Sequence, residues 1–179
     1  MSIPKKLLNY LQQKKVKYEL LPHKTVYTAF DLAQTLKLKP KEVTKTLVVK
    51  LNGKEPAVIV LTSDRNLDKK KFLNVVNEWI NNKKSPPAAG MLREKLHGKA
   101  RMLEFAEEKW MREKVLGKPG ATPPFGILLK MPLFADKAAL AAMKLIINSG
   151  VYERSIVMAA SEFIKLELPV TGRFGALRK

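Results

Sequence analysis

The chain contains no cysteine among its 179 residues. This absence excludes a disulfide framework, a thiolate nucleophile and a cysteine-ligated metal. Histidine is scarce, because only His23 and His97 are present, without the spacing of a metal motif or of a serine–histidine–aspartate triad. We therefore expect no metal site, no cofactor and no protein nucleophile, and we interpret both histidines as surface or loop residues.

Long apolar runs are also missing. No stretch approaches the roughly 20 apolar residues that a membrane-spanning helix needs, and residues 1–6 lack the apolar segment of a signal peptide. We expect a cytoplasmic protein without a membrane partner. Hydrophobic residues make up 46% of the chain, which is typical of a folded protein and fits one domain with a substantial core.

Acidic residues are few compared with basic ones. The chain has 34 lysines and arginines against 16 acidic residues, a formal net charge of +18. The first 100 residues carry most of the excess, with 21 basic and 8 acidic residues. Such a field attracts phosphate backbones and steers association. A polyanion partner is therefore predicted, with the alternative that the charge only keeps the protein soluble.

The strongest local pattern is a β-hairpin over residues 45–61. Its centre is Asn52-Gly53, a pair that tolerates the positive φ angles of a type I′ turn. The second half, residues 57–61, is apolar on both faces and predicts a central strand. Lys45 stands at the start of the first strand, in phase with apolar residues. Its side chain is therefore expected either to reach water or to point into a pocket.

The other patterns mix helices and strands without strict alternation. Thr28 and Asp31 form a capping box before one helix, and either Asn66 or Asp68 begins another. Helices are expected near residues 4–11, 29–36, 66–80, 91–97, 106–116, 136–143 and 161–166, and further strands near residues 16–21, 101–105, 127–130 and 155–159. We predict a single α+β domain with a mixed, largely antiparallel sheet over residues 1–168, followed by a loose basic tail at 169–179.

Residues 117–126 read Gly-Lys-Pro-Gly-Ala-Thr-Pro-Pro-Phe-Gly and predict a rigid loop. The loop lacks the spacing of a nucleotide-binding Walker sequence. Glycines allow a backbone to approach a ligand closely, so that its amides could stabilise an oxyanion. A tight connection between a helix and a strand is the alternative. Residues 148–150 likewise form either a simple turn or a wall of the same pocket.

Taken together and in order, six segments resemble the YbaK/EbsC family, which includes the editing domain of prolyl-tRNA synthetase. The similarity covers about residues 3–168. The segments are Tyr18–His23, Val26–Ala33, Lys45–Val49, Gly117–Gly126, Ile147–Gly150 and Ser161–Leu166. The resemblance implies an editing-domain fold and a hydrolase that cleaves the ester bond of a mischarged aminoacyl-tRNA.

The resemblance also implies roles for individual residues. Lys45 would be the catalytic residue, which orients the aminoacyl ester through the terminal phosphate or the acyl carbonyl. Hydrolysis would rely on the substrate or on water, in agreement with the absence of a protein nucleophile. The implied substrate-binding residues are His23, Thr28, Thr46, Gly120, Pro123, Pro124, Phe125, Gly126, Asn148, Ser149, Gly150 and Ser155.

Four features depart from the family pattern. Ala121-Thr122 stands where many members have glycine or serine before the proline, and Ser149 replaces a common alanine. Ser155 falls where the cysteinyl-specific branch carries an aspartate, and residues 81–99 are longer and more basic than usual. These departures concern amino-acid specificity more than the fold.

The resulting hypothesis is a trans-editing factor that acts on aminoacylated tRNA, with proline tRNA as the expected substrate and prolyl-tRNA synthetase as a candidate partner. The alternative is a non-catalytic tRNA- or RNA-binding protein that retains the fold. In either case the basic clusters are expected to supply affinity for tRNA rather than chemistry. The lysines expected to contact tRNA are Lys69, Lys70, Lys71, Lys83 and Lys84.

Overall fold

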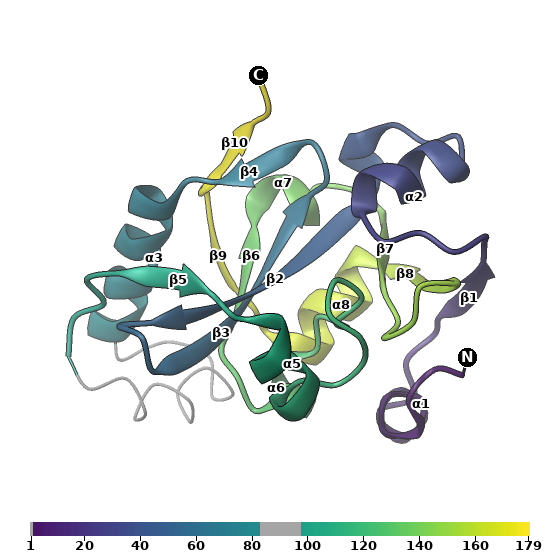
Figure 1. Ribbon diagram of the computed structural model, residues 1–179, viewed down its shortest axis with the longest axis horizontal. Helices are drawn as coiled ribbons and strands as arrows, with labels where there is room; N and C mark the ends of the chain where they lie inside the picture. The colour runs from purple at the N-terminus through teal and green to yellow at the C-terminus, as the bar shows by residue number, and fades with distance from the viewer. Residues whose placement is uncertain (1, 83–97) are drawn as a thin grey trace.

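The computed structural model describes residues 2–82 and 98–179 (Figure 1). Its largest sheet has five strands in the order β5 (Leu103–Phe105), β2 (Thr44–Leu51), β3 (Glu55–Thr62), β6 (Leu133–Asp136) and β9 (Val170–Gly172). Strand β2 is antiparallel to both of its neighbours. Strand β6 is parallel to both β3 and β9, so this sheet is mixed.

Two smaller sheets complete the strand arrangement. An antiparallel sheet has the order β1 (Glu19–Pro22), β8 (Arg154–Ala159) and β7 (Lys144–Asn148). Strands β4 (Arg65–Leu67) and β10 (Gly175–Leu177) form an antiparallel pair. The predicted α+β class, with one domain and a mixed, largely antiparallel set of strands, is confirmed.

The predicted hairpin is present as β2 and β3. Asn52 and Gly53 both have positive φ angles, 51° and 72°, and the Lys54 amide donates a hydrogen bond to the Leu51 carbonyl at 3.0 Å. A left-handed conformation at both positions is what the Asn-Gly pair makes accessible. Residues 57–61 of β3 are completely buried, which confirms the central strand.

Helices cover the sheets on several sides. They are α1 (Lys5–Gln13), α2 (Ala29–Thr35), the 3-10 turn η1 (Pro40–Glu42), α3 (Lys69–Asn81), α5 (Glu108–Lys114), α6 (Gly126–Leu129), α7 (Lys137–Leu140) and α8 (Ala160–Glu167). The N-cap predicted at α2 is confirmed, because Thr28 Oγ1 accepts a hydrogen bond from the Asp31 amide at 3.0 Å. The Asp31 carboxylate accepts from the Thr28 hydroxyl, and not from the Thr28 amide as in a full capping box. Asp68 caps α3 through the Lys71 amide at 3.0 Å, whereas Asn66 lies in β4.

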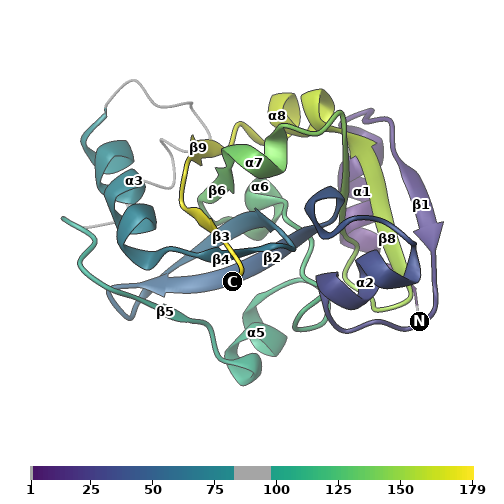
Figure 2. The ribbon, with the colours of Figure 1, turned by 90° about the horizontal axis from the view of Figure 1, so that it is seen from above.

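The core is divided by the five-stranded sheet. The larger part of the core includes Leu7 of α1, Ile147 of β7 and Phe163 of α8, which pack with residues of β2 and β3. On the other face, Phe72 and Trp79 of α3 contact Phe134, with ring centroids 5.1 and 5.4 Å apart. Figure 2 shows α3 at one end of the molecule and α1, β1 and β8 at the other.

A buried carboxylate joins three helices within the larger core. The Tyr10 hydroxyl donates to Glu167 Oε1 at 2.6 Å, and the Ile127 amide donates to Glu167 Oε2 at 3.1 Å. Burial raises the pKa of Glu167, while the hydrogen bonds from Tyr10 and the backbone oppose that shift. These contacts attach α1 and α6 to α8.

Two sequence predictions in this region are wrong. The strand expected at residues 127–130 is instead the helix α6, and the strand follows it as β6. A short apolar run occurs both in strands and in buried helices, so its sequence alone does not decide between them. The hydrogen bond from the Ile127 amide to Glu167 joins residues 40 positions apart, so it could not be predicted from a local pattern. The helix expected at 136–143 is shorter, since α7 ends at Leu140 and β7 begins at Lys144.

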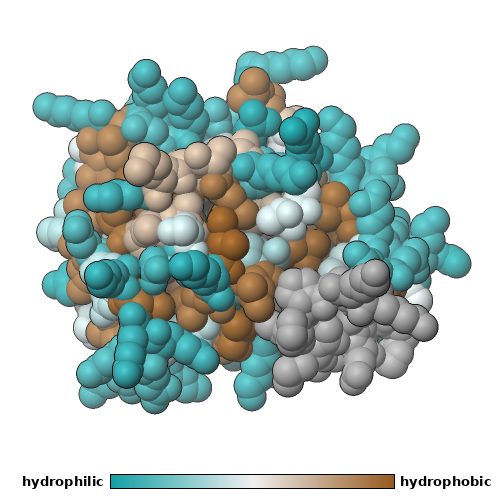
Figure 3. All heavy atoms as spheres, turned by 180° about the vertical axis from the view of Figure 1, so that it is seen from behind, coloured by the Kyte–Doolittle hydropathy of each residue, from teal (hydrophilic) through white to brown (hydrophobic). Residues whose placement is uncertain are grey.

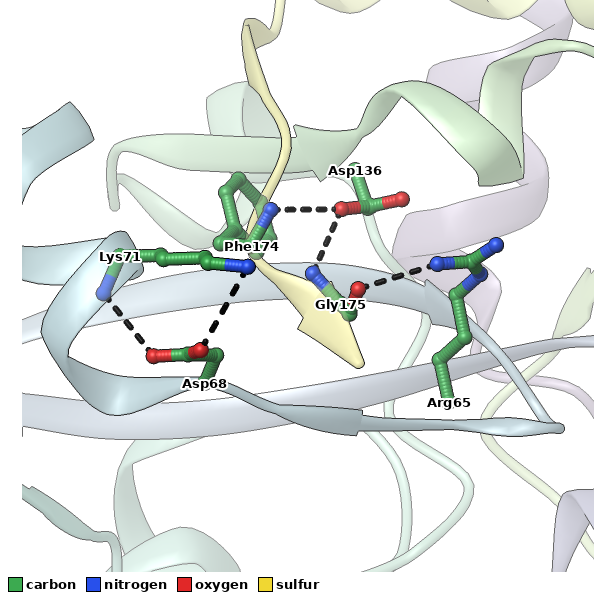
Figure 4. Close-up of polar contacts among 6 residues, drawn as sticks. All are labelled: Arg65, Asp68, Lys71, Asp136, Phe174 and Gly175. Atoms are coloured by element: carbon green, nitrogen blue, oxygen red, sulfur yellow. Dashed lines mark hydrogen bonds and ion pairs between the residues drawn. The ribbon is translucent and has the colours of Figure 1, made fainter. Parts of the chain in front are cut away.

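The expectation of a loose tail after residue 168 is also wrong, because β9 and β10 belong to the folded structure. Figure 4 shows how Asp136 holds this segment: its Oδ2 accepts hydrogen bonds from the Phe174 and Gly175 amides at 2.8 and 2.7 Å. Arg65 Nη1 donates to the Gly175 carbonyl at 3.0 Å. The Phe174 side chain is completely buried. Asp136 and Phe174 are 38 positions apart in the chain, so a local sequence pattern does not predict the hydrogen bond between them.

Candidate active site

A small pocket with a cavity volume of about 20 Å³ lies where residues 120–121 meet the β7–β8 turn and the beginning of α2. Five of the predicted substrate-binding residues line it: His23, Thr28, Gly120, Asn148 and Ser155. The structure thus brings together residues from three separate stretches of the sequence, 23–32, 120–121 and 148–155. The lining also includes Val26, Tyr27, Ala29, Leu32, Ala121, Val151, Tyr152 and Arg154, which the sequence analysis did not predict.

Two glycines allow the 117–126 loop to pack against the β7–β8 turn. Gly117 and Gly150 have φ angles of +82° and +94°, and a Cβ atom on Gly117 would lie 2.4 Å from the Gly150 Cα. The Lys118 amide donates to the Gly150 carbonyl at 3.0 Å, and the Gly150 amide donates to the Ala121 carbonyl at 2.8 Å. The close approach of the two backbones therefore requires glycine at both positions.

His23 and Ser155 form a hydrogen-bonded pair in the pocket wall. His23 Nδ1 lies 2.9 Å from the Lys24 carbonyl, and its Nε2 lies 3.0 Å from Ser155 Oγ. A carbonyl can only accept, so in the neutral imidazole Nδ1 carries the proton and Nε2 accepts from the Ser155 hydroxyl. Ser155, which is buried, then presents only lone pairs to the pocket.

His23 lies in the loop after β1, as expected, and the pair shows that it also contacts a buried residue of the pocket wall. The two residues are 132 positions apart in the chain and meet because β1 pairs with β8. The β1–β8 register places Leu21 opposite Ser155, which brings His23 just beyond the strand end. No short-range sequence motif predicts the contact between His23 and Ser155.

The other polar groups of the lining are held by the loops around them. The Thr28 hydroxyl donates to Asp31 Oδ2 at 2.7 Å, so it is used in capping α2. Asn148 Nδ2 points toward the Gly120 carbonyl, with a separation of 3.5 Å. The Arg154 side chain also lines the pocket, which adds a positive charge to its wall.

Lys45 does not line this pocket. It lies in β2 opposite Leu61, one residue after Thr44, whose hydroxyl donates to the Ile146 carbonyl of β7 at 2.7 Å. The side chain is half-buried, and burial is the main cause that lowers the pKa of Lys45. The positive charge of Arg178 lowers it further, whereas Asp64 has the opposite effect. Arg178 follows β10, so the tail that was expected to be loose brings a second cation near Lys45.

Seven further residues predicted for substrate binding lie outside the lining: Thr46, Pro123, Pro124, Phe125, Gly126, Ser149 and Gly150. Phe125 is completely buried, with its ring centroid 5.9 Å from that of Tyr10. A Cβ atom on Gly126 would lie 2.7 Å from the Met131 carbonyl oxygen. Ser149 donates to the Arg154 carbonyl at 2.5 Å. These contacts give Phe125, Gly126 and Ser149 structural roles.

Two threonine hydroxyls near these segments have no assigned partner. The Oγ1 atoms of Thr46 and Thr122 are buried and make no hydrogen bond within residues 2–82 and 98–179. Buried polar groups are normally paired. The hydroxyl oxygen of Thr46, next to Lys45 on β2, is therefore a buried polar atom without a hydrogen bond among the described residues.

The lysines expected to contact tRNA are divided between described and undescribed parts of the chain. Lys69, Lys70 and Lys71 are exposed on the first turn of α3. The Lys69 ammonium lies 5.3 Å from the centroid of the Phe105 ring, and Lys71 lies 3.8 Å from Asp68. Lys83 and Lys84 fall outside the described residues, as do the rest of the loop from residue 83 onward and the helix expected at 91–97.

Within residues 2–82 and 98–179, no group of three or more histidine, cysteine, aspartate or glutamate side chains is arranged to hold a metal ion. No helix in the same two ranges is long and apolar enough to cross a membrane.

Residues 23–85 match the family model of the aminoacyl-tRNA editing domain. The match contains His23, Thr28, Lys45 and Thr46, and it extends through β2, β3 and α3. Among curated proteins, no sequence matches this chain.

Solved structures share the fold at low sequence identity. A crystal structure of a hypothetical protein superposes with a TM-score of 0.76 at 17% identity, covering 96% of this chain and 100% of that one. A protein provisionally described as a trans-editing enzyme for prolyl-tRNA synthetase gives a TM-score of 0.71 at 17% identity, covering 98% and 99%. A scaffold used for computational epitope grafting gives 0.68 at 15% identity, covering 96% and 95%. At these identities the similarity establishes the fold alone.

Proposed function

We propose that this chain, which carries the aminoacyl-tRNA editing domain and the YbaK-like fold, is a trans-editing deacylase that hydrolyses mischarged aminoacyl-tRNA. The pocket carries this proposal, because it joins a small cavity to polar groups of His23, Asn148 and Ser155. A proline tRNA substrate is the finer proposal. It is supported by the similar fold of the protein described as acting for prolyl-tRNA synthetase.

The pocket would bind the aminoacyl group. Ser155 presents only lone pairs, so it suits a donor such as the α-ammonium group of the amino acid. Apolar walls from Val26, Ala29 and Leu32 would contact the amino-acid side chain. The cavity volume of about 20 Å³ leaves room for little more than one water-sized group, which favours a small amino acid, such as alanine or cysteine.

Hydrolysis requires attack on the acyl carbon and stabilisation of the resulting oxyanion. Water would attack, with a tRNA hydroxyl helping to position it or accept its proton. The ribose oxygen would leave with a proton, so free amino acid and uncharged tRNA form without a covalent enzyme intermediate. Backbone amides of the loop are the candidate oxyanion donors. The amides of Lys118 and Ala121 are used within the fold. The amide of Gly120, which lines the pocket, makes no backbone hydrogen bond among the described residues, and it is the proposed donor.

Lys45 would act beside the pocket rather than inside it. Its ammonium group and the Arg178 guanidinium are close enough for one charge to affect the other. A bound phosphate would relieve this repulsion by pairing with both cations. We assign Lys45 and Arg178 to a phosphate near the aminoacylated end of the tRNA.

Substitution of Lys45 tests the proposal. Lys45→Ala should lower kcat/KM for deacylation by about 100- to 1000-fold, the range found when one electrostatic stabiliser is removed. Thermal stability should change little, because the side chain is only half-buried. Lys50→Ala is the matched control. Lys50 lies on the same strand, but its ammonium lies 4.9 Å from the centroid of the Trp110 ring, so this variant removes a lysine of β2 that has a different neighbour. A near-normal rate in Lys45→Ala would contradict the assignment.

The pH dependence of tRNA binding provides an independent readout for Lys45. Because the pKa of Lys45 is lowered, its charge is lost at a lower pH than that of an ordinary lysine. Binding of uncharged tRNA should therefore weaken as the pH rises toward that lowered pKa. In Lys45→Ala this part of the pH profile should disappear.

A non-catalytic tRNA-binding protein is the second candidate. The position of Lys45 outside the pocket lining favours it, since the predicted catalytic side chain does not contact the cavity. A panel of mischarged tRNAs separates the two functions. Turnover that depends on Lys45 supports the deacylase, whereas tight binding without turnover supports the binding protein.

A further inference from the structure

A second hollow adjoins the pocket along α2. This hollow, here called the α2 groove, has a volume of about 290 Å³ and is lined by Lys24, Thr25, Val26, Tyr27, Asp31, Gln34 and Thr35. Val26 and Tyr27 line both the groove and the pocket. A ligand with two linked parts could therefore occupy both hollows, with Tyr27 at their junction.

Tyr27 is an exposed aromatic ring held at a fixed position. Its side chain is 65% exposed, and its ring meets the Tyr152 ring edge-to-face with centroids 4.9 Å apart. Tyr152 is fixed in turn, because its hydroxyl donates to the Pro119 carbonyl at 2.7 Å. The Lys118 ammonium lies 5.0 Å from the Tyr152 ring centroid. The junction thus combines an open aromatic face with a nearby cation.

These features match the chemistry of a nucleotide. Nucleobases stack on exposed aromatic side chains, and cations beside such rings contact phosphates. The Gln34 side-chain amide lines the groove and makes no hydrogen bond within the described residues. A glutamine amide can form a pair of hydrogen bonds with an adenine edge.

We propose that the α2 groove binds the 3′-terminal adenine of tRNA, stacked on Tyr27, while the aminoacyl group occupies the adjacent pocket. This inference rests on the proposed function, which places the aminoacyl ester in that pocket. The ester joins the amino acid to the ribose of the terminal nucleotide, so the nucleobase must lie next to the acyl site. The α2 groove shares Tyr27 with the pocket. Lys24 lines the groove and the Lys118 ammonium lies over Tyr152, the ring that contacts Tyr27, so both supply positive charge near the junction.

The test compares two uncharged RNA hairpins that mimic the acceptor stem, one ending in CCA and the other in CC. Fluorescence anisotropy should show that the wild-type protein binds the CC hairpin about 5- to 150-fold more weakly, the range expected for one stacked base. Tyr27→Ala should bind both hairpins with the same affinity. Tyr27→Phe should retain the preference, because the stacking face is kept.

Phe30→Ala is the matched control. Phe30 is an aromatic residue of α2 that is 42% exposed and lines neither hollow, so its loss should leave the preference intact. Retention of the CCA preference in Tyr27→Ala, or its absence in the wild type, would overturn the proposal. The preference is measured on uncharged RNA, so it is separable from catalysis. Deacylation without the preference rejects the groove alone, whereas the preference without deacylation rejects the hydrolase alone.

Discussion

At the scale of single residues, Gly117 offers a direct test of how the pocket is built. Gly117→Ala should destabilise the protein by about 1–3 kcal/mol more than Gly98→Ala, the usual range for overpacking. Both glycines have a positive φ angle, but a Cβ atom on Gly117 would clash with Gly150, whereas nothing lies within 4 Å of one on Gly98. Urea denaturation measures the difference. Equal losses of stability would show that the loops separate without cost.

Single residues were predicted best where their role depends on local backbone geometry. Asn52-Gly53, the Thr28 cap and the Asp68 cap follow from rules that operate over a few positions. The His23–Ser155 pair and the Arg178–Lys45 proximity depend instead on strand pairing between distant segments. The sequence analysis placed both His23 and Ser155 at the site through the family resemblance, without predicting that they touch.

At the scale of elements, Asp136 fixes the C-terminal strands to the rest of the fold. Asp136→Ala should cost about 3–5 kcal/mol, because it removes a helix cap and leaves the Phe174 and Gly175 amides without their acceptor. Asp68→Ala is the matched control: it also removes a helix cap, but at a more accessible position, and should cost about 1 kcal/mol. Urea unfolding of both variants measures these losses. Similar values would mean that Asp136 acts only as a cap.

Elements with a strong internal pattern were predicted from the sequence, and those defined by their partners were not. The hairpin and α3 carry their own turn or capping signals. By contrast, α6 and β9 take their structure from contacts with Glu167 and β6, which lie far away in the chain. The candidate site also depends on contacts between segments that lie far apart in the chain, such as His23 with Ser155. For this reason the loop residues 123–126, expected in the pocket wall, lie outside its lining.

At the scale of the whole molecule, hydrophilic and apolar side chains share the face opposite to that of Figure 1. Figure 3 shows apolar side chains gathered near the middle of this face, with hydrophilic ones among and around them. Figure 2 places α8 toward that rear face, and α8 contributes the partly exposed Ile164. The positive charge that attracts tRNA, a net +18 for the chain, therefore need not be spread evenly over the surface. A tRNA that reaches the pocket would meet the lysines of particular elements, and α3 presents three in succession.

The last prediction concerns how this charge binds tRNA. Affinity should fall with salt, with a slope of about −0.7 to −0.9 in log K against log salt for each phosphate contact. Replacing Lys69, Lys70 and Lys71 with glutamate should raise KM and spare kcat, since these exposed side chains lie away from the pocket lining. Replacing Lys14, Lys15 and Lys17, which are also exposed, changes the net charge equally and serves as the control. Identical kinetics in the two variants would assign the effect to overall charge, and salt-independent binding would contradict phosphate contacts altogether.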